Sequence, residues 1–300
     1  MDHKRTYSAV TVTQSNFLVG KVGDYAMLVK MRLSLVVVIS SVLGYLISAD
    51  GFINYAHMGL LVAGGLFVTF AANSLNQVLE KDFDILMSRT ANRPVATGRM
   101  KSSEAVLFAG LSCLVGIVML GAINPLAALL GMISMVLYAF VYTPLKRYST
   151  VAVAVGAVPG ALPVMIGSAA VDGRITLMAL CLFTVQFLWQ FPHFWSIGFL
   201  GFDDYKKAGY RLLPEAYGEI DRNLGLSSMF YAALIIPVVW FACFRLDVTA
   251  GASALISLCT VVYVYFGYKL QRDFDRSSAR KLMFWSFLYL PLVLITFWLM

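Results

Sequence analysis

Charged residues are scarce in this sequence of 300 residues. Asp, Glu, Lys and Arg together make up 13% of it, whereas apolar residues make up 60% and the mean hydropathy is +0.78. Soluble domains carry about 25% charged residues, because their surface must be hydrated. The composition therefore excludes an ordinary soluble enzyme and predicts an integral membrane protein.

Cysteine and histidine are also rare, with four and three copies. The cysteines fall inside apolar segments without paired spacing, which argues against a disulfide framework or a zinc site. The first 25 residues lack the apolar core of a signal peptide. We interpret residues 1–25 as a short polar tail and residues 26–300 as a single intramembrane domain.

Long apolar segments recur along the rest of the chain. Each approaches the ~20 residues that a helix needs to cross a bilayer, and in hydrocarbon every backbone polar group needs a partner inside its own helix. The sequence therefore predicts an all-α polytopic membrane bundle of about nine transmembrane helices. We place them at residues 33–49, 57–79, 103–122, 126–143, 151–171, 176–199, 226–245, 251–269 and 282–299.

Positive charges gather on one side of these predicted helices. Of the 23 Lys and Arg residues, only Arg174 and Arg245 fall on the opposite side. We therefore expect a cytoplasmic N-terminus and a C-terminus across the membrane. Asp2 and Asp24 do not suit a transit peptide, which favours a bacterial plasma membrane over the alternative, a mitochondrial inner membrane. The net charge of +7 reflects this topology and requires no nucleic-acid partner.

A polar stripe marks the end of the second apolar segment. At about 100° per residue, Asn73, Asn76, Glu80 and Asp84 project from one narrow face of a helix, whereas Asp82 points to the other side. Two amides and two carboxylates are thus predicted to lie together at one membrane surface.

Two arginines, Arg89 and Arg93, follow this stripe. Oxygen ligands one helical turn apart suit Mg²⁺, which keeps several waters and bridges to phosphates, so Asn76, Glu80 and Asp84 are candidate metal ligands. The arginines are candidates for binding the phosphate oxygens of a diphosphate. The alternative is that the acids only solvate a helix end and that the arginines only follow the positive-inside rule.

A second polar face lies near the end of the sixth segment. Gln186, Gln190 and His193 project together by helical spacing. Polar groups at that depth face the interior of a bundle, and imidazole can ligate a metal or transfer a proton. The alternative is a hydrogen-bonded packing histidine.

The two motifs together resemble one known family. Asn-x3-Glu-x3-Asp at residues 76–84, followed by Arg-Thr-x-Asn-Arg-Pro, is similar to the first acidic motif of the UbiA-type intramembrane prenyltransferases, which usually have Asp where this chain has Glu80. Pro-His-Phe-Trp at residues 192–195, with Asp-Tyr-Lys-Lys-Ala-Gly at 204–209, resembles the heme O synthases within that family. The resemblance runs from about residue 30 to the last helix, and it implies a prenyltransferase domain.

Further site residues follow from the resemblance alone. Tyr-x-Pro-x-Lys-Arg at residues 142–147 implies that Lys146 lies near the diphosphate, although a snorkelling lysine is the alternative. His193 is implied to bind heme. Residues implied to contact the diphosphate or to form the second acidic motif are Arg147, Asp203, Asp204, Lys206 and Lys207.

The reaction that the resemblance implies uses farnesyl diphosphate, heme b and Mg²⁺. The farnesyl group would pass to a vinyl group of heme b, water would add, and heme O and diphosphate would leave, with a heme A synthase or an oxidase-assembly factor as a possible partner. One alternative is a sister prenyltransferase that uses a quinone precursor, a chlorophyllide or a lipid. The other is a transporter, which the lack of charged residues at mid-membrane disfavours.

Overall fold

The computed structural model describes residues 20–246 and 248–300, and most of them are helical. Within this part of the chain, nine helices are long and apolar enough to cross a membrane, as predicted. They are α2 (Met31–Ala49), α3 (Tyr55–Asp84), α4 (Ser102–Gly121), the fourth span Pro125–Leu145, α7 (Ala152–Asp172), α8 (Leu177–Leu200), the seventh span Leu224–Arg245, α12 (Ala250–Asp273) and α13 (Arg276–Trp298).

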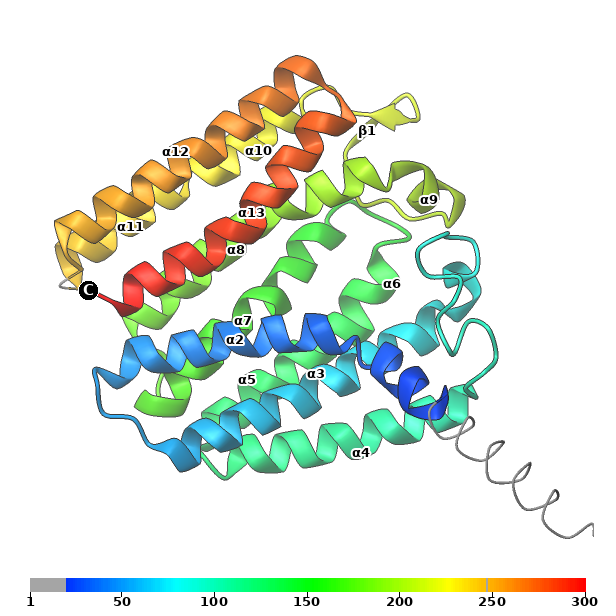
Figure 1. Cartoon of the computed structure of the whole chain (residues 1–300), viewed down its shortest axis with the longest axis horizontal. Coiled ribbons are helices and arrows are strands. Elements are labelled where there is room, and N and C mark those ends of the chain that lie inside the picture. Colours follow the sequence, from blue (N-terminus) through cyan, green and yellow to red (C-terminus); the bar gives the residue numbers. More distant parts are fainter. Residues whose placement is uncertain (1–19, 247) are drawn as a thin grey trace, which may run out of the picture.

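Two of the spans are divided. The fourth consists of α5 (Pro125–Val136), the π-helix η1 (Leu137–Tyr142) and the short α6 (Thr143–Leu145), and the seventh consists of α10 (Leu224–Ala233) and α11 (Ile235–Arg245). The connection after α8 holds α9 (Phe202–Lys207) and an antiparallel pair of two-residue strands, β1 (Glu215–Ala216) and β2 (Glu219–Ile220). This connection lies outside the membrane-spanning helices (Figure 1).

The bundle has two halves, each with its own apolar core (Figure 1). One core is formed mainly by α8, α10, α11, α12 and α13, and the other mainly by α2, α3, α4, α5 and α7. Helix α7 contributes to both cores, because Val153 and Ala157 belong to the first and Leu162 and Met165 to the second. The longer connections, after α3, α6 and α8, lie at one end of the molecule, and the C-terminus lies at the other. The first described helical segment, residues 20–28, lies at the same end as these connections.

Small residues allow α2 and α7 to approach each other closely. A Cβ atom added at Gly44 would collide with the carbonyl oxygen of Val164, and one at Gly167 would collide with that of Ser41. Close backbone approach of this kind holds membrane helices together, because the bilayer supplies little hydrophobic drive between them.

Three predicted boundaries were wrong by four or more residues. The eighth segment was predicted to end at residue 269, whereas α12 runs to Asp273, and the ninth was predicted to begin at residue 282, whereas α13 begins at Arg276. The second segment was predicted to end at residue 79, whereas α3 runs to Asp84. The last turns of α3 carry the polar stripe, which lowers their hydropathy although they continue the helix. Both acids therefore lie on a helix and not in a loop.

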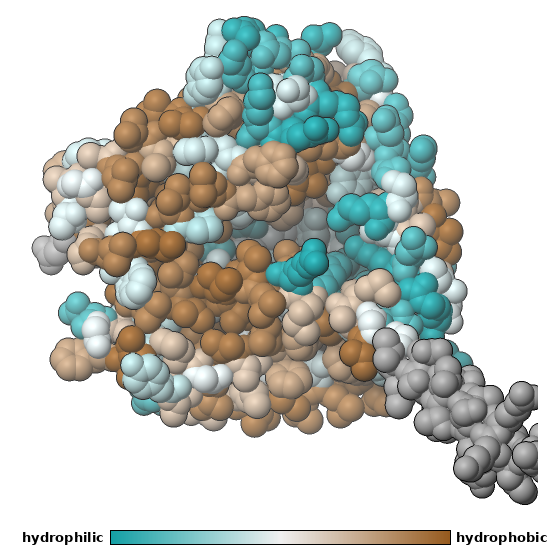
Figure 2. Space-filling model, viewed as in Figure 1, coloured by the Kyte–Doolittle hydropathy of each residue, from teal (hydrophilic) through white to brown (hydrophobic). Residues whose placement is uncertain are grey.

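The surface matches a protein surrounded by lipid. Apolar side chains cover the middle of the face in Figure 2, and polar ones gather at the end that carries the long connections. Large apolar side chains such as Leu111, Val118 and Phe230 are more than half exposed, as expected where lipid and not water is the neighbour. Close to the polar end, this face is hollowed between α2 and α13 (Figure 2).

Candidate functional site

The predicted polar stripe of α3 is present and buried. Asn73, Asn76, Glu80 and Asp84 are at most 3% exposed, whereas Asp82 is exposed. All four buried side chains point into the bundle at its polar end, so the helical spacing placed them correctly. A buried carboxylate is costly unless it is paired with a cation.

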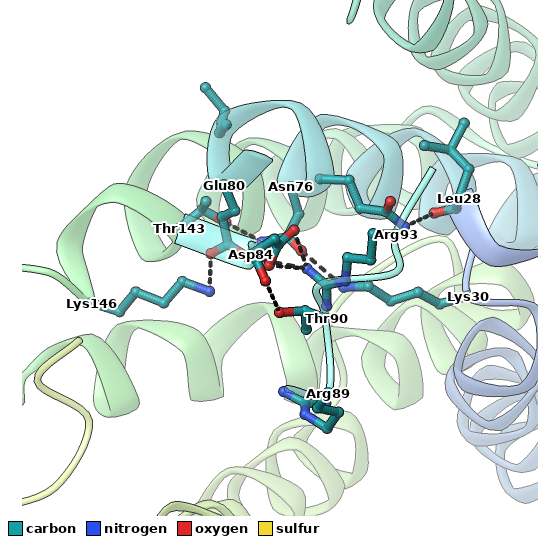
Figure 3. Close-up of polar contacts among 12 residues, drawn as sticks. Leu28, Lys30, Asn76, Glu80, Asp84, Arg89, Thr90, Arg93, Thr143 and Lys146 are labelled. Atoms are coloured by element: carbon teal, nitrogen blue, oxygen red, sulfur yellow. Dashed lines mark hydrogen bonds and ion pairs between the residues drawn. The ribbon is translucent and has the colours of Figure 1, made fainter. Parts of the chain in front are cut away.

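Three cationic side chains pair with this stripe (Figure 3). Arg93 Nη1 lies 2.8 Å from each carboxylate oxygen of Asp84 and 3.6 Å from Glu80 Oε2. Lys146 forms an ion pair with Glu80 Oε1. Lys30 Nζ donates a hydrogen bond of 2.8 Å to Asn76 Oδ1. Three cations thus face two carboxylates, and the excess positive charge favours an anionic ligand.

A tight turn after α3 brings Arg93 back to the acids. The hydroxyl of Thr90 donates to the carbonyl oxygen of Asp84 at 2.9 Å, and the backbone N–H of Arg93 donates to the carbonyl of Thr90 at 2.9 Å. The chain therefore reverses direction within a few residues. As a result Arg93, which was predicted to bind phosphate, pairs with the acids of its own motif when no ligand is bound.

Lys30 is a site residue that the sequence analysis missed. It has a left-handed backbone (φ 48°) between the first helical segment and α2. Amides of α3 hold this bend: Asn73 Nδ2 donates to Val29 O at 3.1 Å and Gln77 Nε2 donates to Leu28 O at 3.0 Å. In the sequence, Lys30 looks like any lysine that precedes a first span, so no signal singled it out.

The two lysines of the site are poorly solvated. Burial, with the neighbouring Arg93 guanidinium, lowers the pKa of Lys30 to about 7. Burial also lowers the pKa of Lys146, against the opposing effect of Glu80. A bound anion would raise both pKa values again, because a nearby negative charge favours the protonated amine.

The donor set of the stripe fits a hard divalent cation that is shared with a ligand. Two carboxylates and one amide oxygen lie one helical turn apart on α3. Nowhere in residues 20–246 and 248–300 do three or more His, Cys, Asp or Glu side chains form a closed metal site. A cation held by Asn76, Glu80 and Asp84 would therefore complete its coordination with water and ligand oxygens, as Mg²⁺ does with phosphates.

The second acidic motif adjoins the loop that follows α3. The hydroxyl of Ser88 donates to Asp204 Oδ2, and Arg89 Nη2 donates to the hydroxyl of Tyr205 at 3.4 Å. Lys207 Nζ is 4.0 Å from Asp204 Oδ1. The structure therefore joins the two motifs through contacts between their loops.

The other predicted residues of this region form no hydrogen bond or ion pair with Glu80 or Asp84 within residues 20–246 and 248–300. Asp203 and Arg89 are exposed, and Arg89 stands apart from the polar network in Figure 3. Lys206 Nζ donates to the carbonyl oxygen of Gly218 at 2.7 Å, within the connection after α8. Arg147 stacks on Phe83 at 3.7 Å and donates to a carbonyl oxygen of α3.

Tyr210 covers the site from the connection after α8. Its ring lies 4.9 Å from Lys146 Nζ, and the neighbouring Arg211 N–H donates to the carbonyl oxygen of Lys146 at 2.7 Å. Burial and the two nearby carboxylates raise the pKa of Tyr210. A tyrosine in a polar loop carries no sequence signal of such a position, and it was not predicted.

His193 lies in the other half of the bundle, where α8 meets α13. Its Nδ1 is 2.7 Å from the hydroxyl of Ser286. Trp189 stacks on the imidazole at 4.6 Å, and Phe287 meets it edge-on at 5.0 Å. No hydrogen bond among the described residues joins His193 to the acids of α3.

The two glutamines of the same face serve helix packing. Gln186 Nε2 donates to Gly160 O at 2.9 Å, and Gln190 Nε2 donates to Ala157 O at 2.8 Å. Both carbonyls belong to α7, so the glutamines join α8 to α7. The polar face predicted for residues 186–193 is therefore buried, but its members contact three different helices, because Gln186 Nε2 also lies 3.5 Å from Ser40 Oγ of α2.

Comparisons with known proteins agree with this geometry. A sequence profile of the UbiA prenyltransferase family matches residues 37–288. The protoheme IX farnesyltransferase of Christiangramia forsetii is 40% identical over 278 residues, which cover 91% of this chain and 92% of the relative. The mitochondrial protoheme IX farnesyltransferase of Homo sapiens is 34% identical over 275 residues, which cover 91% of this chain and 61% of the relative.

Solved structures share the fold. The structure of a digeranylgeranylglyceryl phosphate synthase matches with a TM-score of 0.79 at 20% identity, covering 93% of this chain and 98% of that one. A UbiA homolog from Archaeoglobus fulgidus, bound to GPP and Mg²⁺, matches with a TM-score of 0.68 at 15% identity, covering 91% and 99%. At these identities the likeness shows the fold alone.

Proposed function

This chain belongs to the UbiA prenyltransferase family, and we propose that it transfers the farnesyl group of farnesyl diphosphate to a vinyl group of heme b, with addition of water, to give heme O and diphosphate. The observation that carries the proposal is the consistent identity of 34–40% to protoheme IX farnesyltransferases over 91% of the chain. The buried polar cluster of α3 supplies the groups that the reaction needs.

The proposed diphosphate site is the cluster around α3. Arg93, Lys146 and Lys30 lie where they can donate to phosphate oxygens. Asn76, Glu80 and Asp84 are the proposed ligands of Mg²⁺, which when bound would neutralise the developing charge of the diphosphate leaving group. The homolog from Archaeoglobus fulgidus was solved with both a prenyl diphosphate and this metal.

The ion pairs hold the catalytic groups in place before the substrate arrives. Glu80 is paired with Lys146, and Asp84 is paired with Arg93, all of them at most 16% exposed as side chains. Because these charged groups are already in position, they need to move little to stabilise charge on the leaving group. Such preorganisation is the main source of electrostatic catalysis. The cations then exchange carboxylate for phosphate as their partner.

The proposed heme site surrounds His193. Because Nδ1 contacts Ser286, Nε2 is the nitrogen left for the iron, and it has no hydrogen-bond partner among the described residues. Trp189 stacks on the imidazole and Phe287 meets it edge-on, so the surroundings of His193 are aromatic and apolar. A porphyrin between α8 and α13 would expose its vinyl group inside the membrane.

The proposed orientation places the polar end of the molecule in the cytoplasm. Tyr217 and Phe52 lie in connections at opposite ends, and both are almost fully exposed. A membrane-impermeant thiol reagent should label Tyr217→Cys only from the cytoplasmic side and Phe52→Cys only from the other. The reverse pattern would overturn the orientation. A heme A synthase or an oxidase-assembly factor is the proposed recipient of the product.

The test is a mass assay of extracted heme. The purified protein is incubated with heme b, farnesyl diphosphate and Mg²⁺, beside the Glu80→Gln variant. We expect the mass of heme to increase by one farnesyl group and one hydroxyl group in the wild type only, because the water that captures the new cation loses a proton. Diphosphate release with unchanged heme and another prenylated acceptor would move the function to a sister enzyme. Solute flux in liposomes without diphosphate release would favour a transporter.

A further inference from the structure

Thr143 connects the fourth span to the polar stripe of α3. It is fully buried, and its Oγ1 lies 2.9 Å from the carbonyl oxygen of Tyr138 and 3.1 Å from Asn76 Nδ2. The family motif Tyr-x-Pro-x-Lys-Arg at residues 142–147 assigns no role to Thr143. Its hydroxyl nevertheless contacts the side-chain amide of Asn76 and can therefore fix the orientation of that amide.

Hydrogen-bond chemistry fixes the direction of this chain of contacts. A hydroxyl has one hydrogen, and Thr143 donates it to the carbonyl of Tyr138, so toward Asn76 it can only accept. The amide of Asn76 must therefore present its NH₂ to Thr143 and its oxygen to the opposite side. There Lys30 Nζ, which in its protonated form can only donate, lies 2.8 Å from Asn76 Oδ1. Both ends require the same orientation of the amide.

The backbone of the fourth span explains why the hydroxyl lies there. Pro144 has no N–H to bond to the preceding turn, and its ring crowds the carbonyl four residues earlier. The preceding turn is widened into the π-helix η1, in which the N–H of Thr143 bonds to the carbonyl of Tyr138. That carbonyl accepts from both the backbone and the hydroxyl of Thr143. π-helical turns are often found at functional sites.

We propose that Thr143 is a positioning residue, which holds the amide oxygen of Asn76 toward the diphosphate and its metal. The proposal rests on the function proposed above. An amide oxygen can bind Mg²⁺ and an amide NH₂ cannot, so a flipped Asn76 would remove one ligand. Residues that orient metal ligands typically change metal affinity by about 10- to 100-fold when they are replaced.

The first test compares Thr143→Val with Thr143→Ser. Valine keeps the shape and removes the hydroxyl, whereas serine keeps the hydroxyl. We measure Mg²⁺-dependent binding of farnesyl diphosphate by calorimetry, without heme. The valine variant should need about 10- to 100-fold more Mg²⁺, and the serine variant should bind like the wild type. A valine variant with the Mg²⁺ dependence of the wild type overturns the proposal.

Thr260 offers a matched control. It is also fully buried, donates to a carbonyl four residues earlier at 2.8 Å, and bridges to a second helix through the hydroxyl of Tyr289 at 2.7 Å. Thr260→Val should lower the unfolding temperature about as much as Thr143→Val, without changing the Mg²⁺ dependence. Equal changes in Mg²⁺ dependence for both variants would mean a merely structural role and overturn the proposal.

A double-mutant cycle tests the mechanism itself. In the Asn76→Asp background the carboxylate presents oxygen on both sides, so its orientation no longer matters. Thr143→Val should then have little further effect on Mg²⁺ dependence, and an undiminished effect would contradict the positioning role. A wild type that binds farnesyl diphosphate with Mg²⁺ but makes no heme O would overturn only the proposed acceptor. A wild type without Mg²⁺-dependent binding would overturn both proposals.

Discussion

Arg93 holds both carboxylate oxygens of Asp84, with Nη1 at 2.8 Å from each. The two residues are separated by a turn, and the same nitrogen lies 3.6 Å from Glu80. One guanidinium thus ties both acids of the motif together. Because Asp84 is fully buried, its charge depends on this partner until a metal replaces it.

The first prediction concerns the stability of this pair. Arg93→Gln leaves the buried carboxylate of Asp84 unpaired, so we expect a loss of about 3–5 kcal/mol in the free energy of unfolding. Mg²⁺ should restore part of the loss, because the metal supplies the missing positive charge. Thermal unfolding in detergent, with and without Mg²⁺, measures both effects.

Arg272→Gln is the matched control. Arg272 Nε pairs with Asp273 at 2.6 Å, but the two side chains are 53% and 34% exposed. The loss there should stay below about 1 kcal/mol and should not respond to Mg²⁺. The same loss in both variants would show that the burial of Asp84 does not govern the pair.

The second prediction concerns the acid that departs from the usual family motif. Glu80→Gln keeps the shape and removes the charge that Lys146 needs, so we expect prenyl transfer to fall by about 100-fold or more. Glu80→Asp keeps the charge on a shorter arm, and it should retain measurable activity with a higher Mg²⁺ requirement.

The control for this charge is Glu104→Gln. Glu104 pairs with Lys21 at 2.9 Å, also at the polar end, but both side chains are about 30% exposed. Turnover of farnesyl diphosphate should stay within about twofold of the wild type, because exposed pairs contribute little. If Glu80→Gln also kept turnover within about twofold of the wild type, Glu80 would have no part in the proposed mechanism.

Much of the fold could be predicted because it is governed by local patterns. Hydropathy located all nine spans, and helical spacing placed Asn73, Asn76, Glu80 and Asp84 on one buried face. Both signals depend only on neighbouring residues, so they do not require knowledge of how the helices pack.

What could not be predicted depends on contacts between distant segments. Lys30 and Thr143 both contact Asn76, although they are 46 and 67 residues away from it in the sequence. No sequence pattern indicates contacts between residues so far apart along the chain. Arg147 follows Lys146 directly, yet it packs on Phe83 while its neighbour pairs with Glu80. Only the helix packing decides which of two adjacent cations reaches the acids.

The third prediction separates the two acids of the second motif. Asp204 accepts from Ser88 and lies near Lys207, whereas Asp203 is exposed and forms no hydrogen bond or ion pair within the described residues. Asp204→Asn should lower the rate of prenyl transfer by about tenfold, and Asp203→Asn by less than about twofold.

Ser88→Ala shows whether the contact between the loops carries this effect. If Asp204 acts through Ser88, the serine variant should lose as much activity as Asp204→Asn. If Asp204 binds the substrate or a second metal directly, only the aspartate variant should lose activity. A larger loss for Asp203→Asn than for Asp204→Asn would contradict the interpretation.

The fourth prediction assigns heme binding to His193. We expect His193→Ala to lose the absorption change that heme b shows on binding and to make no heme O, while it still binds farnesyl diphosphate with Mg²⁺. Ser286→Ala removes one hydrogen bond to the imidazole, worth about 0.5–1.5 kcal/mol. It should weaken heme binding by about two- to tenfold, because the ring keeps its stacking on Trp189.

The two halves of the bundle make this assignment testable apart from the diphosphate site. His193 contacts α13, whereas the acids lie on α3 and share no hydrogen bond with it among the described residues. His57→Ala, at the opposite end of α3 from the acids, is the control and should leave both ligands bound. If His193→Ala binds heme like the wild type but no longer binds farnesyl diphosphate, His193 belongs to the diphosphate site and the assignment is wrong. The separation seen in the structure predicts the loss of heme alone.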